Sequence, residues 1–235
     1  MKKIFLAVAS VLALGLVVGC KQQIEGSLNV TSTNFNKSLD PVTTIKTYVY
    51  SVSGSATTTT KTVVYEKAGE FNRNVSTTTT VWTPTKDVSV TETTDPNNNS
   101  ITYTITAYGD VTMTSESIYK SSKEAVPLKS KTVIDKVQNA SLGNYRQDII
   151  ITKIDNKFYI NNVDGTKKVV EGVDFSAAEI DLSKFNDETS TESVSYSGAV
   201  YDYSWDEASA TPKDYTTKTT ATSSGPTYAL KLTRK

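Results

Sequence analysis

Residues 101–115 read ITYTITAYGDVTMTS. Apolar and polar residues alternate here, so that one face of an extended chain carries a single apolar set: Ile101, Tyr103, Ile105 and Ala107. A period of two is what a half-buried β-strand requires. Gly109 and Asp110 follow, and this dipeptide between two alternating segments predicts a two-residue hairpin turn, because glycine accepts a positive φ.

The same alternation extends the β prediction along the chain. One face of an earlier strand carries Tyr48, Tyr50 and Val52. Further turn signals are Ser53-Gly54, Ala68-Gly69 and residues 95–99. Because such turns join neighbouring strands directly, we predict an antiparallel meander over residues 42–119.

A polar passage at residues 121–124, ended by Pro127, is the best candidate for a boundary within the β region. It separates two possible halves, 42–120 and 128–235. In the second half, Asp155-Asn156 and Asp164-Gly165 lie between apolar segments and predict tight hairpin turns.

One short helix is expected near residues 176–185. Ser176 and Glu179 form a capping box, and Phe175 can meet Ile180 as the accompanying hydrophobic staple. Such a helix would cover an open end or one face of the sheet. The predicted fold class is therefore all-β, an antiparallel meander forming a curved sheet, an open barrel or a sandwich, with one short helix.

Composition excludes several kinds of chemistry. Histidine is absent, which excludes histidine-based catalytic triads and zinc sites with imidazole ligands. The chain has 25 cationic and 25 anionic residues, and without Lys2 and Lys3 the count is 23 against 25. A near-neutral domain has no general attraction to nucleic acid. We expect no enzyme activity, no catalytic residue, no metal site and no cofactor.

Threonine makes up roughly one residue in six, well above its ordinary share. Two runs of four, Thr57–Thr60 and Thr77–Thr80, each lead into an apolar strand. Glycosylation is one interpretation of such runs. We favour a solvent-facing β surface, because threonine suits a pleated, half-exposed strand and the prolines of a mucin-like stalk are missing.

Two groups of polar side chains are candidate sites. The carboxylates of Asp202, Asp206 and Glu207 lie next to aromatic residues in a pattern that a sugar-binding or glycosidase cleft would show. Side chains that could offer oxygen ligands to calcium are Asp155, Asn156, Asn161, Asn162 and Asp164. The first group lacks a second motif, and turns explain the second group, so neither is predicted as a site.

The first twenty residues form an export segment. A cationic start at residues 1–3 precedes an apolar run from Ile4 to Val18. This run is shorter than the ~20 apolar residues of a membrane span, but it fits the hydrophobic region of a signal peptide. The segment closes with Val17-Val18-Gly19-Cys20, and Cys20 is the single cysteine of the sequence.

This ending resembles a lipobox, the signature of bacterial lipoproteins, although that family more often has Leu where Val17 stands. The resemblance implies a signal peptide at residues 1–19, cleavage between Gly19 and Cys20, and acylation of the Cys20 thiol. An ordinary secretory signal or an uncleaved anchor is the alternative. Residues 20–41 would then be the lipidated cysteine and a polar tether, and residues 42–235 the β-rich ectodomain.

Acyl chains on Cys20 would attach the protein to a lipid bilayer in the cell envelope, outside the cytoplasm. Lys21, in place of an inner-membrane retention aspartate, favours the outer membrane if the source has two membranes.

Two functions follow as hypotheses. The first is non-catalytic binding of a protein or glycan partner by a polar, adaptable β surface, in adhesion or envelope organisation. The second is a carrier that holds a lipid or other apolar ligand within a curved sheet. A carrier needs a sizeable apolar cavity, whereas an interaction module has a filled core.

Overall fold

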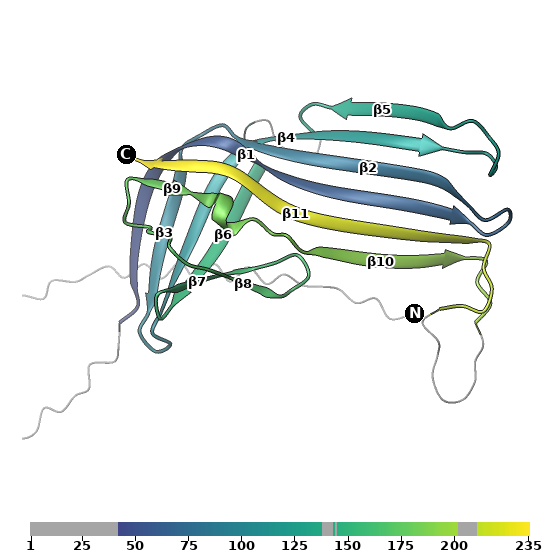
Figure 1. The fold of residues 1–235 in the computed structure, drawn as a ribbon. Helices are drawn as coiled ribbons and strands as arrows, with labels where there is room; N and C mark the ends of the chain where they lie inside the picture. The colour runs from purple at the N-terminus through teal and green to yellow at the C-terminus, as the bar shows by residue number, and fades with distance from the viewer. Residues whose placement is uncertain (1–41, 138–142, 144, 202–210) are drawn as a thin grey trace, which may run out of the picture. The chain divides into compact units, whose positions relative to one another are not determined.

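The computed structural model describes residues 42–137, 143, 145–201 and 211–235, which belong to one compact unit. Within these ranges eleven strands form one antiparallel sheet, so the all-β prediction is confirmed (Figure 1). The strands are β1 (Thr44–Glu66), β2 (Phe71–Pro84), β3 (Val88–Asp95), β4 (Ser100–Tyr119), β5 (Leu128–Ile134), β6 (Tyr145–Ile154), β7 (Lys157–Asn161), β8 (Lys167–Val170), β9 (Glu179–Asp181), β10 (Ser190–Ser197) and β11 (Thr217–Arg234).

The strand order joins the two ends of the described chain. It runs β10-β11-β1-β2-β4-β6-β7-β8, while β3 pairs with β1 and β4, β5 pairs with β4, and β9 pairs with β11. The first strand therefore lies beside the last, from Tyr50 opposite Arg234 to Glu66 opposite Thr217. This pairing joins residues that are far apart in sequence. Local patterning does not predict such a pair.

β2 and β3 together act as one long strand against β1. Tyr50 lies opposite Val88 and Ala56 lies opposite Trp82, so the register continues unchanged from β3 to β2. Residues 85–87 between them leave the ladder. The sheet consequently has two parts, joined by β1, β4 and β11.

The first part, the ring part, contains β3, β6, β7, β8 and β9 with the adjoining halves of β1, β4 and β11 (Figure 1). It curves into a partial ring whose open side is bridged by a short 3-10 helix, η1 (Leu182–Phe185), that contacts β11 and β8. Twenty buried apolar side chains form one cluster inside it. The Tyr103 ring stacks on Phe175 at 4.2 Å, and Phe158 packs against both.

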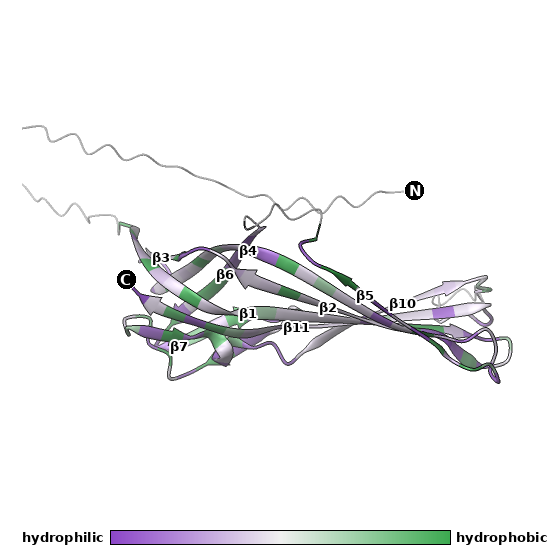
Figure 2. Cartoon of the chain, turned by 90° about the horizontal axis from the view of Figure 1, so that it is seen from above, coloured by the Kyte–Doolittle hydropathy of each residue, from purple (hydrophilic) through white to green (hydrophobic). Residues whose placement is uncertain are grey.

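The second part, the distal sheet, contains six strands in the order β10-β11-β1-β2-β4-β5. In Figure 1 these strands extend side by side away from the ring part. No described strand or helix covers either of their faces. Figure 2 shows pale, purple and green segments mixed along these strands.

The predicted alternation in residues 101–107 is confirmed, but the hairpin at Gly109 and Asp110 is wrong. Tyr103, Ile105 and Ala107 are buried, and β4 continues through Gly109 to Tyr119 without a turn. An added Cβ at Gly109 would lie 2.7 Å from the carbonyl carbon of Thr83 and 2.8 Å from Trp82 Nε1, and closer still to the carbonyl oxygen. The glycine is there for close approach of two strands, a known use of glycine within a sheet.

The expected helix near residues 176–185 is present as the single 3-10 turn η1. The capping box is not formed, because Ser176 lies in a turn and Glu179 begins β9. Asp181 caps η1 instead, accepting a hydrogen bond from the Ser183 N–H at 2.9 Å. Leu182 and Phe185 are buried, as their apolar character requires.

The turn at Asp155-Asn156 is confirmed, since both residues have positive φ and join β6 directly to β7. The turn at Asp164-Gly165 is a longer connection, in which the Asn162 N–H donates to the Thr166 carbonyl. Residues 121–127 form a loop between β4 and β5. β4, which precedes this loop, pairs with both β5 and β6, which follow it.

Candidate functional site

The distal sheet is the main candidate for a functional surface, because six strands expose two faces that no described element covers. Both four-threonine runs lie in it, and they pair with one another. Thr58, Thr59 and Thr60 lie opposite Thr80, Thr79 and Thr78. The prediction that these runs form a half-exposed β surface is confirmed.

One face of the distal sheet, the hydroxyl face, is defined by two rows of residues that lie opposite one another across all six strands. The first row is Thr191, Ser223, Thr60, Thr78, Ser115 and Thr132, and the second is Ser193, Ala221, Thr62, Ser76, Ser117 and Ser130. Cross-strand partners share a face, so eleven of these twelve side chains present hydroxyls to the same side.

Some of these hydroxyls bind one another. Thr60 Oγ1 and Ser223 Oγ are 3.1 Å apart, and Ser117 Oγ and Ser130 Oγ are 2.7 Å apart. Thr78 donates to Ser115 Oγ at 3.3 Å. Such cross-strand pairs stabilise a sheet that has no apolar core beneath it.

The opposite face, the mixed face, combines apolar, aromatic and charged residues. One of its rows is Val194, Thr220, Val63, Val75, Ile118 and Lys129, with Val194 and Ile118 exposed. A hollow of about 470 Å³ lies near its β5 edge, lined by Val75, Thr77, Glu116, Ile118, Lys129 and Lys131 among others.

An aromatic cluster lies at the end of the mixed face farthest from the ring part. Tyr65 and Tyr196 flank Lys218 in one cross-strand row. The Tyr196 and Tyr215 rings meet edge to face at 5.1 Å, and Lys67 Nζ lies 5.0 Å from the Tyr215 ring centre. The cluster brings phenols and ammonium groups together, as protein-binding surfaces often do.

Contacts within and next to this cluster shift the pKa values of its ionisable groups. Lys67 forms an ion pair with Asp214, which raises the pKa of the lysine and lowers the pKa of the carboxyl. Partial desolvation, with help from Glu70, raises the pKa of Tyr65. These groups therefore keep their ordinary charges at neutral pH.

A smaller hollow of about 180 Å³ lies where the ring part meets the distal sheet. Its apolar lining includes Trp82, Tyr228, Val111 and Ile149. Trp82 Nε1 donates to the Tyr145 carbonyl at 3.3 Å, and burial raises the pKa of Tyr228 to about 12. Drug-sized ligand pockets are roughly 300–1,000 Å³, so this hollow is small.

The buried carboxylate of Asp187 has a structural explanation. It accepts hydrogen bonds from the Thr189 N–H at 2.8 Å, the Thr189 hydroxyl at 2.6 Å and the Val163 N–H. Its oxygens thus hold the backbone of two loops. Such saturation is typical of a structural buried charge.

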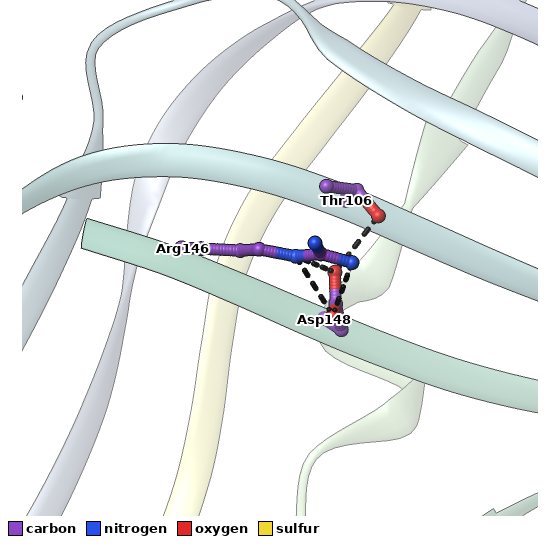
Figure 3. A network of polar contacts seen from close by, with 3 residues as sticks. All are labelled: Thr106, Arg146 and Asp148. Carbon is purple, nitrogen blue, oxygen red and sulfur yellow. Dashed lines mark hydrogen bonds and ion pairs between the residues drawn. The ribbon is translucent and has the colours of Figure 1, made fainter. Parts of the chain in front are cut away.

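A polar network on the outer surface of the ring part joins β4 and β6 (Figure 3). Asp148 accepts from the Thr106 hydroxyl at 2.8 Å and from Arg146 Nε at 3.0 and 3.1 Å. The carboxylate neutralises the guanidinium, and the pKa of Arg146 is raised by this contact. The network therefore supports strand pairing, and its neutralised guanidinium is poorly suited to binding an anion.

The other sequence candidates are located as follows. Gly19 and Cys20 lie outside the described residues, as do Asp202, Asp206 and Glu207. The possible calcium ligands lie in β7 and in the turns that flank it. Within the described ranges, no group of three or more acidic, histidine or cysteine side chains is arranged to hold a metal ion.

Sequence reasoning predicted a solvent-facing β surface at the threonine runs, but it did not show that six strands join into a sheet with two uncovered faces. The signal was present in the length of the Thr/Ser-rich strands, but the cross-strand rows depend on registers that only the structure gives. No helix in the described part of the chain is long and apolar enough to cross a membrane. Comparisons with protein-family models, with curated proteins and with solved structures find no match.

Proposed function

We propose that this protein is a membrane-anchored bacterial lipoprotein that binds a macromolecular partner, a protein or a glycan, through the mixed face of its distal sheet. The observation that carries the proposal is the uncovered face itself. A six-strand sheet with exposed Val194 and Ile118 and a tyrosine cluster offers apolar, aromatic and hydrogen-bonding groups together. Tyrosine makes a large contact at low cost in conformational entropy, and small hydroxyl side chains add adaptable hydrogen bonds.

The core of the ring part supports binding at a surface over the carrier hypothesis. Twenty buried apolar side chains occupy the space in which a carrier would hold its ligand. The hollow beside Trp82 and Tyr228 has about 180 Å³, below the roughly 300–1,000 Å³ of drug-sized ligand pockets. Adhesion or envelope organisation is therefore the better supported class.

Anchoring at Cys20 is tested by intact mass spectrometry of the protein from its own membrane. The lipobox resemblance predicts an amino terminus at Cys20 that carries acyl mass, and a Cys20→Ser variant that leaves the membrane fraction. A mature protein without acyl mass contradicts the anchor, whatever the distal sheet binds.

Partner binding is tested by placing a photo-crosslinking amino acid at Tyr65, on the mixed face. The matched control replaces Tyr108, an exposed tyrosine on the ring part. We expect irradiation of intact envelopes to give discrete adducts at position 65 and few at position 108. Equal adducts at both positions would contradict a binding face on the distal sheet.

A further inference from the structure

The distal sheet ends in two uncapped strands, β5 on one side and β10 on the other. In the described part of the chain, no strand pairs with the outer edge of either. Every residue of β5 is exposed, including Leu128 and Val133. An open strand edge with unpaired N–H and carbonyl groups is a template for pairing with another chain.

Strand direction makes these two edges compatible. Every neighbouring pair in the order β10-β11-β1-β2-β4-β5 is antiparallel. With six strands, β5 and β10 run in opposite directions. When a second copy is placed beside the first by translation, its β10 is therefore antiparallel to β5, and both faces of the sheet continue across the junction.

The register brings opposite charges together. Glu192 and Lys131 stand at the two ends of one cross-strand row on the mixed face: Glu192, Thr222, Lys61, Thr77, Glu116 and Lys131. Continuing this row places Glu192 of the second copy opposite Lys131. In the same register Leu128 meets Ser195, and Thr132 meets Thr191, so every residue of β5 except Ile134 lies opposite a residue of β10.

The charges also select against symmetric pairing. Two β5 strands in antiparallel contact would bring Lys129 and Lys131 of one copy next to the same lysines of the other. Like charges directly opposite destabilise a strand pair, whereas opposite charges stabilise it. The lysines thus disfavour pairing of β5 with the β5 of a second copy and favour its pairing with β10.

We propose that the protein self-associates edge to edge, with β10 of one copy pairing antiparallel with β5 of the next in the register that joins Glu192 to Lys131. The contact is heterologous, so it leaves no closed dimer and repeats from molecule to molecule, into a ring or an open row. Six strands at ~4.8 Å set an axial repeat of roughly 29 Å. This inference is independent of the anchor and of the partner proposed above.

Disulfide trapping tests the register. In a Cys20→Ser background, Thr132→Cys and Thr191→Cys are placed in separate copies, mixed and mildly oxidised. The proposal predicts that the mixed dimer exceeds either homodimer at least about tenfold, with a yield that rises with protein concentration. In the control, Leu128→Cys replaces Thr132→Cys, which displaces the thiol by four residues, or ~13 Å along the strand. Equal yield from this control overturns the proposal.

A charge exchange tests the chemistry. Lys131→Glu in the Thr132→Cys copy should lower the mixed-dimer yield about 2- to 30-fold, because attraction becomes repulsion. Glu192→Lys in the other copy should restore the yield. Lys131 also pairs with Glu116 inside its own chain at 3.0 Å, so the first change alone can act within the monomer. Rescue by Glu192→Lys in the other copy cannot arise within the monomer that carries Lys131→Glu. Failure of this rescue overturns the proposal.

Discussion

Replacing Gly109 by alanine tests the close approach of β2 and β4 at the junction between the two parts of the sheet. The new Cβ would lie 2.7 Å from the Thr83 carbonyl carbon and 2.8 Å from Trp82 Nε1. Both distances are about 1 Å short of ordinary contact. The nearest atoms belong to the backbone, so a side-chain rotation cannot relieve the overlap.

The expected loss combines two effects. Overpacking in a well-packed region costs about 1–3 kcal/mol. Displacement of Trp82 also weakens its hydrogen bond to the Tyr145 carbonyl, worth about 0.5–1.5 kcal/mol. We therefore expect Gly109→Ala to lower the free energy of unfolding by about 2–4 kcal/mol.

Urea denaturation followed by far-ultraviolet circular dichroism measures this loss. The matched control is Gly165→Ala, at a loop glycine with φ of 84° and nothing within 4 Å of the added Cβ. Its change reflects backbone conformation alone, about 1–2 kcal/mol. If Gly109→Ala costs no more than Gly165→Ala, the steric argument is refuted.

Three further predictions concern the ring part. Phe185→Ala should lower the free energy of unfolding by about 3–5 kcal/mol, because Phe185 is buried against two aromatic rings. Phe71→Ala, at the half-exposed first residue of β2, should have a much smaller effect in the same urea titration. Burial raises the pKa of Tyr103 and of Tyr228 to about 12, so these phenols should remain protonated between pH 10 and 12 in an ultraviolet titration. Their unfolded forms ionise near pH 10, so stability should fall as the pH rises through this interval. Asp148→Asn should lower the unfolding free energy by at most about 1 kcal/mol, because its ion pair is largely solvent-exposed; a loss several times larger would contradict this.

The stability of the distal sheet follows from strand continuity. β1, β4 and β11 each pass from the filled ring part into the distal sheet. The register of β1 against β3 continues into β2, whereas the register of β1 against β11 shifts at an irregularity between Thr57 and Thr59. Zippering from a fixed register needs no new long loop to close. Threonine side chains then stabilise the pairs locally.

Several elements were predictable because they depend on short-range patterns. The alternation around Tyr50 and Tyr103 gave the buried faces of β1 and β4 correctly. The Asp155-Asn156 turn was also predictable, since two residues between alternating segments restrict the backbone to a primed turn.

Other predictions failed where a distant contact prevailed over a local preference. Gly109 reads as a turn residue, yet the Thr83 carbonyl that requires it lies on another strand. Ser176 reads as a helix cap, but Glu179 pairs with Thr233 at the far end of the chain. In each case a ladder hydrogen-bonded to distant residues outweighed a weak local propensity.

The sequence by itself determined the β class, the buried faces of the strands, the half-exposed character of the threonine runs and the prediction of a lipidated Cys20. All of these depend on the type and spacing of residues within short windows of the sequence. Only the tertiary structure decided that Tyr50 lies beside Arg234, that the two threonine runs face each other, and that six strands continue beyond the core as an uncovered sheet. The physical reason is that strand pairing is non-local: alternation fixes which face of a strand is buried, but not which strand lies next to it.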